Sequence, residues 1–376
     1  MAYKVVVLAG DGIGPEVIRE AIKVLKATED AYGLEFDLVP YPAGGRHYLE
    51  AGEEWPDGAF ESSRSADAIL LGAVGYPEAV LPDGNIAGAG VVFGLRFGLD
   101  LYANVRPARL YPNVKHRVHD RFRRVWDAEK VDFVIIRENT EGLYPPIRGV
   151  LERGGTQELA IDNRVTTRKG AERVIRFAFE KSLSREGAPG DGKRRVTVVD
   201  KSNVMDGDRL FRRIYDEVAE EYPDVKRDYA FVDAFMQWMI RTPEAYDVAV
   251  MSNLFGDIAT DLASVLQGGM GLAAGGNVGD HHAMFEPIHG SAPKHEGKDR
   301  ANPNAAVLAV QMMLQWLGEK KGDATLQEAA GTVEAAVEAV LKEGKYLTRD
   351  LGGKAKGSQV GDALVKQVTA LASPRG

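Results

Sequence analysis

The chain has 376 residues, of which 44% are hydrophobic and 27% charged, with a formal net charge of -8 and no cysteine. This composition is typical of a globular protein with two domains or one large two-lobed unit. It excludes disulfides, thiolate metal sites and a cysteine nucleophile. The acidic balance argues against nucleic acid as the main partner, because a phosphate backbone requires a basic face.

Membrane and export signals are not expected. No stretch approaches the roughly 18 apolar residues that span a bilayer. The first residues, MAYKVVVLAGDGIGPEV, lack the long apolar run behind a basic start that marks a secretory signal. Together with the lack of cysteine, this favours a cytoplasmic protein without membrane contact.

Short apolar runs alternate with helical patterns along the chain. Strands are expected at 4–8, 68–72, 133–136, 196–199 and 248–251. Helices are expected at 16–26, 168–181, 209–221, 301–317 and 326–341, and 184–195 is expected to be an exposed loop. This alternation predicts an α/β fold with a largely parallel or mixed sheet.

The first strand is followed by Gly10-Asp11-Gly12, which invites comparison with the dinucleotide-binding fingerprint. That fingerprint needs a third small residue three places after Gly12, where this chain has Pro15. The sequence therefore argues against a Rossmann fold. The glycines still allow a ligand to approach the backbone closely.

Three arginines lie beside apolar residues rather than in charge runs: Arg96 in GLRFGLDLY, Arg106 in ANVRPA and Arg137 in VIIRENTEG. The guanidinium is a rigid fork of donors that matches a carboxylate. Taken singly, each arginine is better explained by an ion pair with a structural Asp or Glu. Taken together, they indicate a binding site for a di- or tricarboxylate.

Two aspartates, Asp257 and Asp261, are four residues apart in NLFGDIATDLAS and would share one helix face. A divalent cation would offset their repulsion, and oxygen ligands without nearby His or Cys favour Mg²⁺ or Mn²⁺. Asp233, in YAFVDAF, could supply a third carboxylate. The alternative for the pair is a solvated helix face.

Two residues could exchange protons with a substrate. Lys201 follows the expected strand VTVVD, at the carboxyl end where α/β sheets usually bind ligands. A neighbouring metal or cation would lower its pKa, which suits a general base. Tyr144, in NTEGLYPP, has a phenol that could donate a proton. Either residue alone is more often structural.

Late in the chain, FEPIHGSAP at 285–293 is expected to be a loop rich in Gly, Pro and Ser, able to wrap a nucleotide. With GDGIGPEV, GAVG, LDLYANVRP, RENTEGLY, DKSNVM and NLFGDIATDLAS it forms a series of seven ordered motifs, and TRDLGGKA follows near the end. Through these motifs, nearly the full length of the chain resembles the β-decarboxylating dehydrogenases, which act on isocitrate, 3-isopropylmalate, homoisocitrate, tartrate or D-malate.

The resemblance implies an isopropylmalate/isocitrate dehydrogenase-like fold, a large mixed sheet flanked by helices in two lobes with a cleft. Residues 1–103 and 265–376 would form a larger, dinucleotide-binding lobe. Residues 104–264 would form a smaller lobe with the dimer contacts, the metal ligands and the catalytic residues. The enzyme would be a homodimer whose active sites borrow Lys201, Asn203 and Asp233 from the neighbouring chain.

The resemblance also implies residue roles. Lys201 would accept the hydroxyl proton, and Tyr144 would protonate the enolate left by CO₂. Asp233, Asp257 and Asp261 would bind Mg²⁺ or Mn²⁺. Substrate contacts would come from Arg96, Arg106, Arg137, Asn203, Asp233, Val92 and Phe93. Cofactor contacts would come from Ala73, Val74, Asn253, Glu286, His289, Gly290, Ser291, Ala292, Lys294, His295 and Asn302.

The substrate and the cofactor stay open within the family. Isocitrate enzymes carry Ser and Asn where this chain has Gly90 and Val92, so a 3-substituted malate, above all 3-isopropylmalate, is expected. Phe93 could shrink the pocket towards malate or tartrate, RENTEGLY is common in homoisocitrate enzymes, and Val92 and Phe93 could be simple helix packing. Lys294, with Arg349, would suit the 2′-phosphate of NADP, whereas alkylmalate enzymes use NAD.

A catalytically silent subunit of a hetero-oligomer is the alternative from another class. Such subunits often lose the lysine, the tyrosine or the metal acids. This chain retains all of them, which argues against silence.

Overall fold

The computed structural model describes residues 2–372, which fall into two compact units. Unit 1 holds the described residues up to Leu101, Arg109–Ala128 and those from Ser264 onward, and unit 2 holds Tyr102–Ala108 and Glu129–Ala263. The expected division placed all of 104–264 in one lobe, but 109–128 cluster with unit 1. His116 explains part of this difference, because its Nε2 lies 2.9 Å from the carbonyl oxygen of Leu266.

Unit 1 contains a five-stranded run of sheet in the order β13-β14-β3-β1-β2. Strand β1 is parallel to β2 and β3, β14 is parallel to β3, and β13 is antiparallel to β14. The strands are β1 (Tyr3–Leu8), β2 (Phe36–Tyr41), β3 (Ala68–Leu71), β13 (Ala274–Val278) and β14 (Ala283–Pro287). The apolar run of β3 is buried along its whole length, as in a strand covered on both faces.

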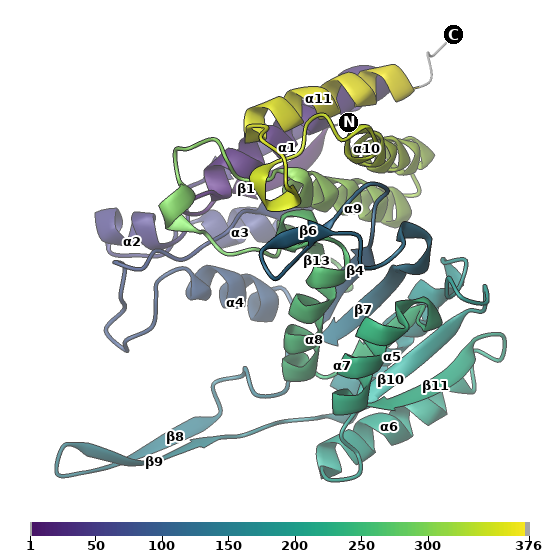
Figure 1. Ribbon diagram of the computed structural model, residues 1–376. Coiled ribbons are helices and arrows are strands. Elements are labelled where there is room, and N and C mark those ends of the chain that lie inside the picture. Colours follow the sequence, from purple (N-terminus) through teal and green to yellow (C-terminus); the bar gives the residue numbers. More distant parts are fainter. Residues whose placement is uncertain (1, 373–376) are drawn as a thin grey trace. The chain divides into compact units, whose positions relative to one another are not determined.

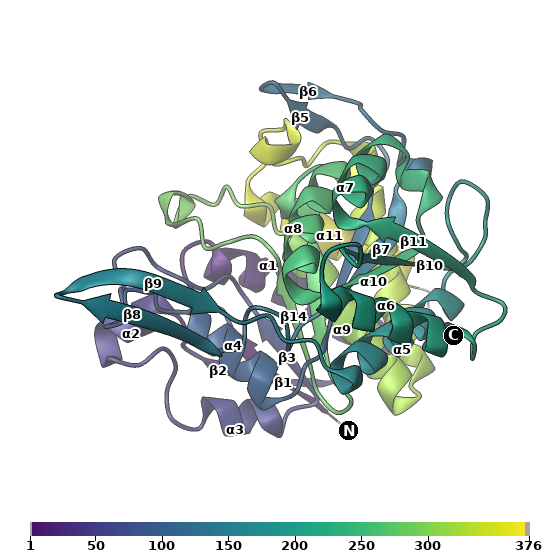
Figure 2. The same cartoon turned by 90° about the horizontal axis from the view of Figure 1, so that it is seen from below.

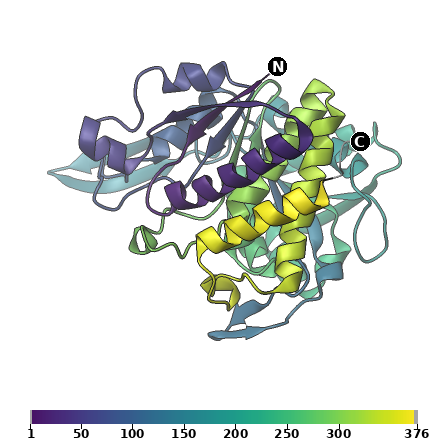
Figure 3. The same cartoon turned by 90° about the horizontal axis from the view of Figure 1, so that it is seen from above.

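Seven helices of unit 1 belong to the described residues. Helix α1 has Pro15 in its first turn and ends at Gly33, whose φ of 64° suits a glycine C-cap. Helices α1 and α11 lie side by side in Figure 3, in purple and yellow. The helices are α1 (Gly14–Tyr32), α2 (Gly45–Ala51), α3 (Ala59–Arg64), α4 (Ala89–Gly98), α9 (Asn304–Lys321), α10 (Ala324–Glu343) and α11 (Gly357–Leu371).

A small hairpin and three 3-10 turns complete unit 1. The hairpin pairs β5 (His116–Val118) with β6 (Arg121–Arg123). The turns are η3 (Met270–Leu272), η4 (Pro293–His295) and η5 (Arg349–Leu351). A further turn, η1 (Ala128–Lys130), lies where the chain passes into unit 2.

Unit 2 contains the strand order β11-β10-β12-β7-β4. Strands β11, β10, β12 and β7 are mutually parallel, with Val248 paired with both Val196 and Val134. The strands are β4 (Ala103–Arg109), β7 (Asp132–Glu138), β10 (Arg195–Asp200), β11 (Lys226–Phe231) and β12 (Val248–Met251). Around them lie α5 (Arg168–Leu183), α6 (Asp206–Ala219), α7 (Val232–Arg241), η2 (Pro243–Ala245) and α8 (Asn253–Leu266), whose last turn belongs to unit 1.

A two-stranded hairpin extends from unit 2 as a long ribbon (Figures 1 and 2). Strands β8 (Arg148–Arg153) and β9 (Thr156–Asp162) are exposed at every residue. Gly154 and Gly155 form the turn with φ values of 56° and 77°, the paired positive angles of a tight type I′ turn.

The sequence predicted the fold class correctly, α/β with a mixed sheet, and each of the five expected strands is present. Helix α9 begins at Asn304 rather than 301, because the residue before Pro303 is disfavoured in a helix. Helix α6 begins at Asp206, three residues earlier than expected. The expected loop at 285–293 begins inside strand β14, which extends to Pro287. No helix among the described residues is both long and apolar enough to cross a membrane.

The core of unit 2 gives a first testable prediction. Phe179 is fully buried on α5, where it stacks on Tyr222 at 5.0 Å. Phe179→Ala should lower the free energy of unfolding of this unit by about 3–5 kcal/mol, because it removes the ring and leaves a cavity. Leu183→Ala, at the 43% exposed end of the same helix, is the control. Equal loss of stability in chemical denaturation of the two variants would contradict this packing.

Candidate active-site residues

Four side chains of interest follow strand ends at one edge of the unit 2 sheet. Arg137 lies at the end of β7, Lys201 follows β10, Asp233 follows β11 and Asn253 follows β12. Because these four strands are parallel, their carboxyl ends share an edge. This is where open α/β sheets usually bind ligands.

Arg137 is the centre of a polar cluster. Its side chain is 2% exposed and donates through Nη1 to Asp257. Its Nε and Nη2 donate to Oδ1 of Asn253 at 2.9 and 2.7 Å. Tyr144 donates its hydroxyl proton to the other oxygen of Asp257, and its ring lies 5.3 Å from the Arg137 guanidinium carbon. The structure thus brings Arg137, Tyr144 and Asp257 together.

Gly256 makes this cluster possible. A Cβ atom at Gly256 would lie 2.5 Å from Cβ and Cγ of Arg137, which is closer than real side chains approach. The glycine therefore lets α8 pass directly over the arginine. The same helix carries Asp257 to the guanidinium.

Asp257 and Asp261 lie one turn apart on α8. Burial, and then the charge of Asp257, raise the pKa of the Asp261 carboxyl, while Arg106 and Arg137 act in the opposite direction. A carboxylate whose charge is disfavoured by burial and by a second carboxylate one turn away is a suitable ligand for a divalent cation. The donor set therefore fits Mg²⁺ or Mn²⁺.

Lys201 and Asp233 form a second pair. The ammonium Nζ of Lys201 lies 2.5 Å from Oδ1 of Asp233, and this hydrogen bond lowers the pKa of the carboxyl. The Lys201 side chain is 27% exposed, and Nζ lies 5.8 Å from the centre of the Phe231 ring. Asn203 is exposed in the same turn. These residues are in reach of a ligand rather than locked in the core.

The expected metal trio is not assembled within one chain. Among residues 2–372, no three or more His, Asp or Glu side chains form a group able to hold a metal ion. Asp233 contacts Lys201, whereas Asp257 contacts Arg137 and Tyr144. Completion of the trio by a second copy of the chain stays a prediction.

The other two arginines have polar partners of their own. Arg106, on β4, donates from Nε to Oδ1 of Asn104 at 2.6 Å. In unit 1, Arg96 on α4 donates from Nη2 to Oε1 of Glu286 at 3.3 Å. The Nε of Arg96 is buried without a hydrogen-bond partner among the described residues. The alternative explanation, an ion pair with a protein carboxylate, thus holds for Arg96 and Arg137. The buried Nε still allows Arg96 to bind a further acceptor.

Helix α4 carries Arg96 together with the two expected specificity residues. Phe93 stacks on Phe97 with ring centres 5.8 Å apart. Val92 is partly buried against the apolar cluster around β1 and β3. Simple helix packing therefore accounts for part of each side chain. Both remain partly exposed, which is also what contact with a ligand requires.

A carboxylate from outside the helix caps the start of α4. Oε1 of Glu54 accepts hydrogen bonds from the backbone N–H of Gly88 and, at 3.0 Å, of Gly90. A Cβ at Gly90 would lie 1.9 Å from the other carboxylate oxygen, so the cap requires glycine there. Negative charge at a helix N-terminus is stabilising, and Glu54 thereby fixes the helix that presents Val92, Phe93 and Arg96.

The expected cofactor residues of unit 1 gather at the carboxyl ends of its parallel strands. The carboxylate of Asp11, after β1, accepts the N–H groups of Gly45, Arg46 and Gly75 at 2.7–2.9 Å. The backbone N–H of Asp11 donates to Ala73, and Oγ of Ser291 donates to the Gly75 carbonyl. In the chain, Ala73 and Val74 come directly after β3, and His289–Ala292 come shortly after β14.

His289 is a half-buried residue whose buried Nε2 suggests a ligand here. Its Nε2 has no partner within the described residues, and burial lowers the pKa of the imidazole. A neutral imidazole with an unpaired nitrogen could bond a cofactor. Asn302 is held by Asp350 at 2.9 Å, while Lys294 and His295 lie in η4, on the surface beyond the loop. These features fit a polar nucleotide. Glu286, which was expected to contact the cofactor, pairs with Arg96.

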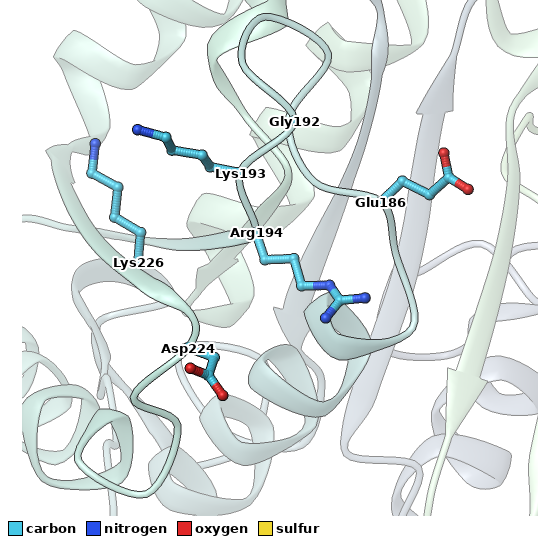
Figure 4. A pocket seen from close by; sticks show the side chains of 6 residues that line it. All are labelled: Glu186, Gly192, Lys193, Arg194, Asp224 and Lys226. Carbon is cyan, nitrogen blue, oxygen red and sulfur yellow. The ribbon is translucent and has the colours of Figure 1, made fainter.

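The surface hollow in Figure 4 lies elsewhere. It is lined by side chains of both charges from the loop before β10 and the start of β11, namely Glu186, Gly192, Lys193, Arg194, Asp224 and Lys226. These are the amino ends of parallel strands. The hollow is therefore at the opposite edge of the sheet from Lys201 and Asp233.

Several residues that hold the site were not predicted from the sequence. Glu54, Asn104 and Asn277 contact site residues from elsewhere in the chain, and Asn277 donates to Glu286 at 2.8 Å. Asp11 lies in a motif that was noted only for its glycines. Its position between two glycines after a strand was a signal for a carboxylate that accepts backbone amides.

Both sequence and structure comparisons match nearly the whole chain. A family model described as isocitrate/isopropylmalate dehydrogenase matches residues 4–364. The 3-isopropylmalate dehydrogenase of Thermobifida fusca is 40% identical over 369 residues, covering 97% of each chain. The 3-isopropylmalate/3-methylmalate dehydrogenase of Methanocaldococcus jannaschii is 41% identical over 97% of this chain and 99% of its own. The isocitrate dehydrogenase structure from Methylococcus capsulatus has a TM-score of 0.84 at 36% identity, covering 98% of this chain and 99% of that chain.

The Glu54 cap gives the second prediction. Glu54→Ala should lower the free energy of unfolding by about 0.5–2 kcal/mol, because the first N–H groups of α4 lose their acceptor. The neighbouring Glu53→Ala is the control, since Glu53 is 49% exposed and its only described ion-pair partner is His47 at 3.9 Å. Thermal unfolding of both variants measures the difference. A Glu54 variant as stable as the Glu53 variant would show that the cap contributes nothing.

Proposed function

The chain belongs to the isocitrate/isopropylmalate dehydrogenase family, and we propose that within it the chain oxidises and decarboxylates 3-isopropylmalate. One observation carries the proposal. The residues to which we assign this reaction lie near the carboxyl ends of parallel strands in one sheet, in two clusters: Arg137 with Tyr144 and Asp257, and Lys201 with Asp233. The relatives with nearly full-length similarity that carry this substrate in their names support it.

Arginines and aspartates would bind the substrate and the cation. We assign Arg96, Arg106 and Arg137 to the substrate carboxylates, and Asp257 and Asp261 to Mg²⁺ or Mn²⁺, with Asp233 supplied by a second chain. When bound, the cation polarises the substrate oxygen and the nicotinamide accepts a hydride. The fit rests on the paired carboxylates of α8 and on the donors of the Arg137 guanidinium beside them.

Lys201 and Tyr144 would move the protons. In its neutral form Lys201 accepts the proton of the substrate hydroxyl through Nζ, and Asp233 holds that nitrogen in place. After CO₂ has left, Tyr144 donates its phenolic proton to the carbon that carried the carboxylate. The hydrogen bond from Tyr144 to Asp257 orients the phenol for this step.

The substrate within the family is proposed from α4. Val92 and Phe93 offer a partly exposed apolar surface, which suits an alkyl group better than the extra carboxylate of isocitrate. Burying an isopropyl group gains on the order of 1.5–3 kcal/mol. Homoisocitrate and D-malate or tartrate are the alternative substrates, and the size of Phe93 is the feature that favours the smaller ones.

The cofactor is proposed as a nicotinamide dinucleotide, NAD or NADP. Related enzymes that use NAD usually carry an aspartate after GSAP, where this chain has Lys294 and then His295. A cation at that position favours a 2′-phosphate, and Arg349 could add to it. Lys294 therefore favours NADP, whereas the 3-isopropylmalate branch uses NAD.

A homodimer is proposed from the exposed apolar residues of unit 2. On the β8–β9 hairpin, Leu151, Leu159 and Ile161 share one face and are 43%, 49% and 50% exposed. An isolated two-stranded hairpin is marginal in water, and a second copy of the same ribbon would cover its apolar face and its edges. Trp238 and Ile258, 44% and 55% exposed, extend the candidate surface to α7 and α8. A cytoplasmic location stays a prediction.

The activity itself is the third prediction. With Mg²⁺ or Mn²⁺ and 3-isopropylmalate, reduced nicotinamide should form and CO₂ be released, faster than with isocitrate, homoisocitrate, D-malate or tartrate. Running the panel with NAD and with NADP decides the cofactor, and a strong preference for NAD would exclude the argument from Lys294. Lys201→Ala and Asp257→Asn should each abolish turnover without unfolding the protein, while Lys193→Ala should leave it intact. Full activity in either site variant would overturn the assignment.

The dimer is the fourth prediction. Leu151→Lys combined with Leu159→Lys should convert the protein from dimer to monomer, because four charges would meet across a two-fold interface. Sedimentation velocity measures the change. Val125→Lys, at a 46% exposed apolar position of unit 1, is the control and should leave the dimer intact. A hairpin variant that stays dimeric would exclude the hairpin as the main contact.

A further inference from the structure

A buried ion pair joins the Lys201 turn to the start of the α8 helix. Arg164 follows the exposed hairpin, and its guanidinium contacts both carboxylate oxygens of Asp208, with Nη1 at 3.1 Å from Oδ2. The side chains are 17% and 2% exposed, so this is not a surface ion pair. A desolvated pair of this kind is costly to break, because the remaining partner is left charged and buried.

Asp208 connects this pair to Lys201. Its Oδ2 also accepts the backbone N–H of Lys201 at 2.9 Å. The carbonyl of Lys201 in turn accepts the N–H groups of Val204 and Met205, both at 3.0 Å, which closes the turn before α6. The backbone from which the Lys201 side chain extends is therefore held at its N–H by Asp208 and at its carbonyl by the turn.

Arg164 connects the same pair to α8. Its Nη2 donates to Oγ of Ser252 at 2.9 Å, and its guanidinium carbon lies 4.9 Å from the centre of the Phe255 ring. Ser252 immediately precedes α8, and its carbonyl accepts the N–H of Gly256. The next residue is Asp257, so Arg164 holds the first turn of the helix that carries the two aspartates.

The neighbouring residue extends the connection to Tyr144. Val165 exchanges two backbone hydrogen bonds with Gly142, at 2.9 and 3.0 Å, and Gly142 lies two residues before Tyr144. The base of the hairpin is thus in contact with three segments, which carry Tyr144, Lys201 and Asp257.

We propose that Arg164 and Asp208 are positioning residues that hold the Lys201 turn and the start of α8 of one chain in place, with Lys201 serving the site of a second chain and Asp257 the site of its own. Neither residue needs to touch the substrate. They act by fixing geometry. If either the Lys201 turn or the start of α8 moved, the Arg164 guanidinium would lose hydrogen bonds to one of them. The test by enzyme kinetics rests on the proposed function, whereas the test by hydrogen–deuterium exchange does not.

A matched ion pair in the same unit separates positioning from stability. Arg185 donates from Nε to Oδ1 of Asp247 at 2.7 Å, with side chains 16% and 0% exposed. Asp247 also accepts a backbone N–H, that of Arg195 at 3.1 Å. Since Arg195 begins β10 and Asp247 precedes β12, this pair lies at the opposite edge of the sheet. It matches the Arg164 pair in burial and in the backbone N–H that its aspartate accepts, although Arg185 also donates to Asp132.

The kinetic arm is the fifth prediction. Arg164→Met and Asp208→Asn should each lower kcat by about 10- to 100-fold, since small displacements of catalytic groups have effects of this size. The substrate KM should change less than about 3-fold, because the carboxylate-binding arginines are untouched. The double variant should lose little more than either single one. Arg185→Met should keep kcat within about 2-fold. Equal effects in the Arg164 and Arg185 variants, or additive losses in the double variant, would overturn the proposal.

The exchange arm uses hydrogen–deuterium exchange of the full chain and needs no substrate. In Arg164→Met, amide exchange should accelerate at least 10-fold in both 201–206 and 253–257, while Arg185→Met leaves both segments unchanged. Acceleration of one segment alone would exclude a link between them. If Arg164→Met does not fold, Ser252→Ala removes the hydrogen bond to the start of α8 without touching Asp208, and should accelerate exchange in 253–257 while 201–206 stays protected. An inactive wild type with the expected exchange pattern would reject the proposed function and retain the positioning role.

Discussion

The buried guanidinium of Arg137 is the constraint on which the described site depends. A charge that is 2% exposed must be paired, and its three nitrogens are satisfied by Asn253 and Asp257 from the start of α8. Satisfying them fixes the direction in which α8 leaves β12, and Gly256 is the residue that lets the helix come close enough. Asp257 then receives the Tyr144 hydroxyl as well. One desolvated cation thus determines where the Tyr144 phenol and the carboxylates of α8 lie.

In unit 2 a buried cation gathers acceptors, whereas in unit 1 carboxylates gather backbone N–H donors. Asp11 collects three N–H groups from two loops, and Glu54 collects two from the start of α4. Loops that carry ligand-binding residues would otherwise have unsatisfied donors and several conformations. Each carboxylate holds several backbone N–H groups in fixed positions relative to one another. The α4 side chains and the Ser291 loop are therefore positioned by two acids outside the proposed catalytic and metal-binding residues.

The sequence revealed the candidate site residues better than the residues that hold them in place. The family expected from seven ordered motifs is confirmed, as is the α/β fold with its mixed sheet. Arg137, Lys201 and Asp257 were recognisable because each follows an apolar strand or has a partner one helical turn away. Arg164, Asp208 and Glu54 were not, because their partners lie 88, 44, 36 or 34 residues distant in the chain. The β8–β9 hairpin also escaped prediction, since its apolar residues are exposed and do not mark a buried strand.

The reaction type is better determined than the substrate for a physical reason. Proton transfer and carboxylate binding use charged groups with several directional hydrogen bonds, and their removal leaves buried charges unpaired. In the proposed function, the choice among 3-substituted malates depends on apolar contact with Val92 and Phe93, where one methylene changes the free energy by only about 1–3 kcal/mol. Those two side chains also pack within the protein, Phe93 on Phe97 and Val92 on the core. A modest repacking of α4 would therefore alter the preferred alkyl group while leaving every hydrogen bond of the unit 2 cluster in place.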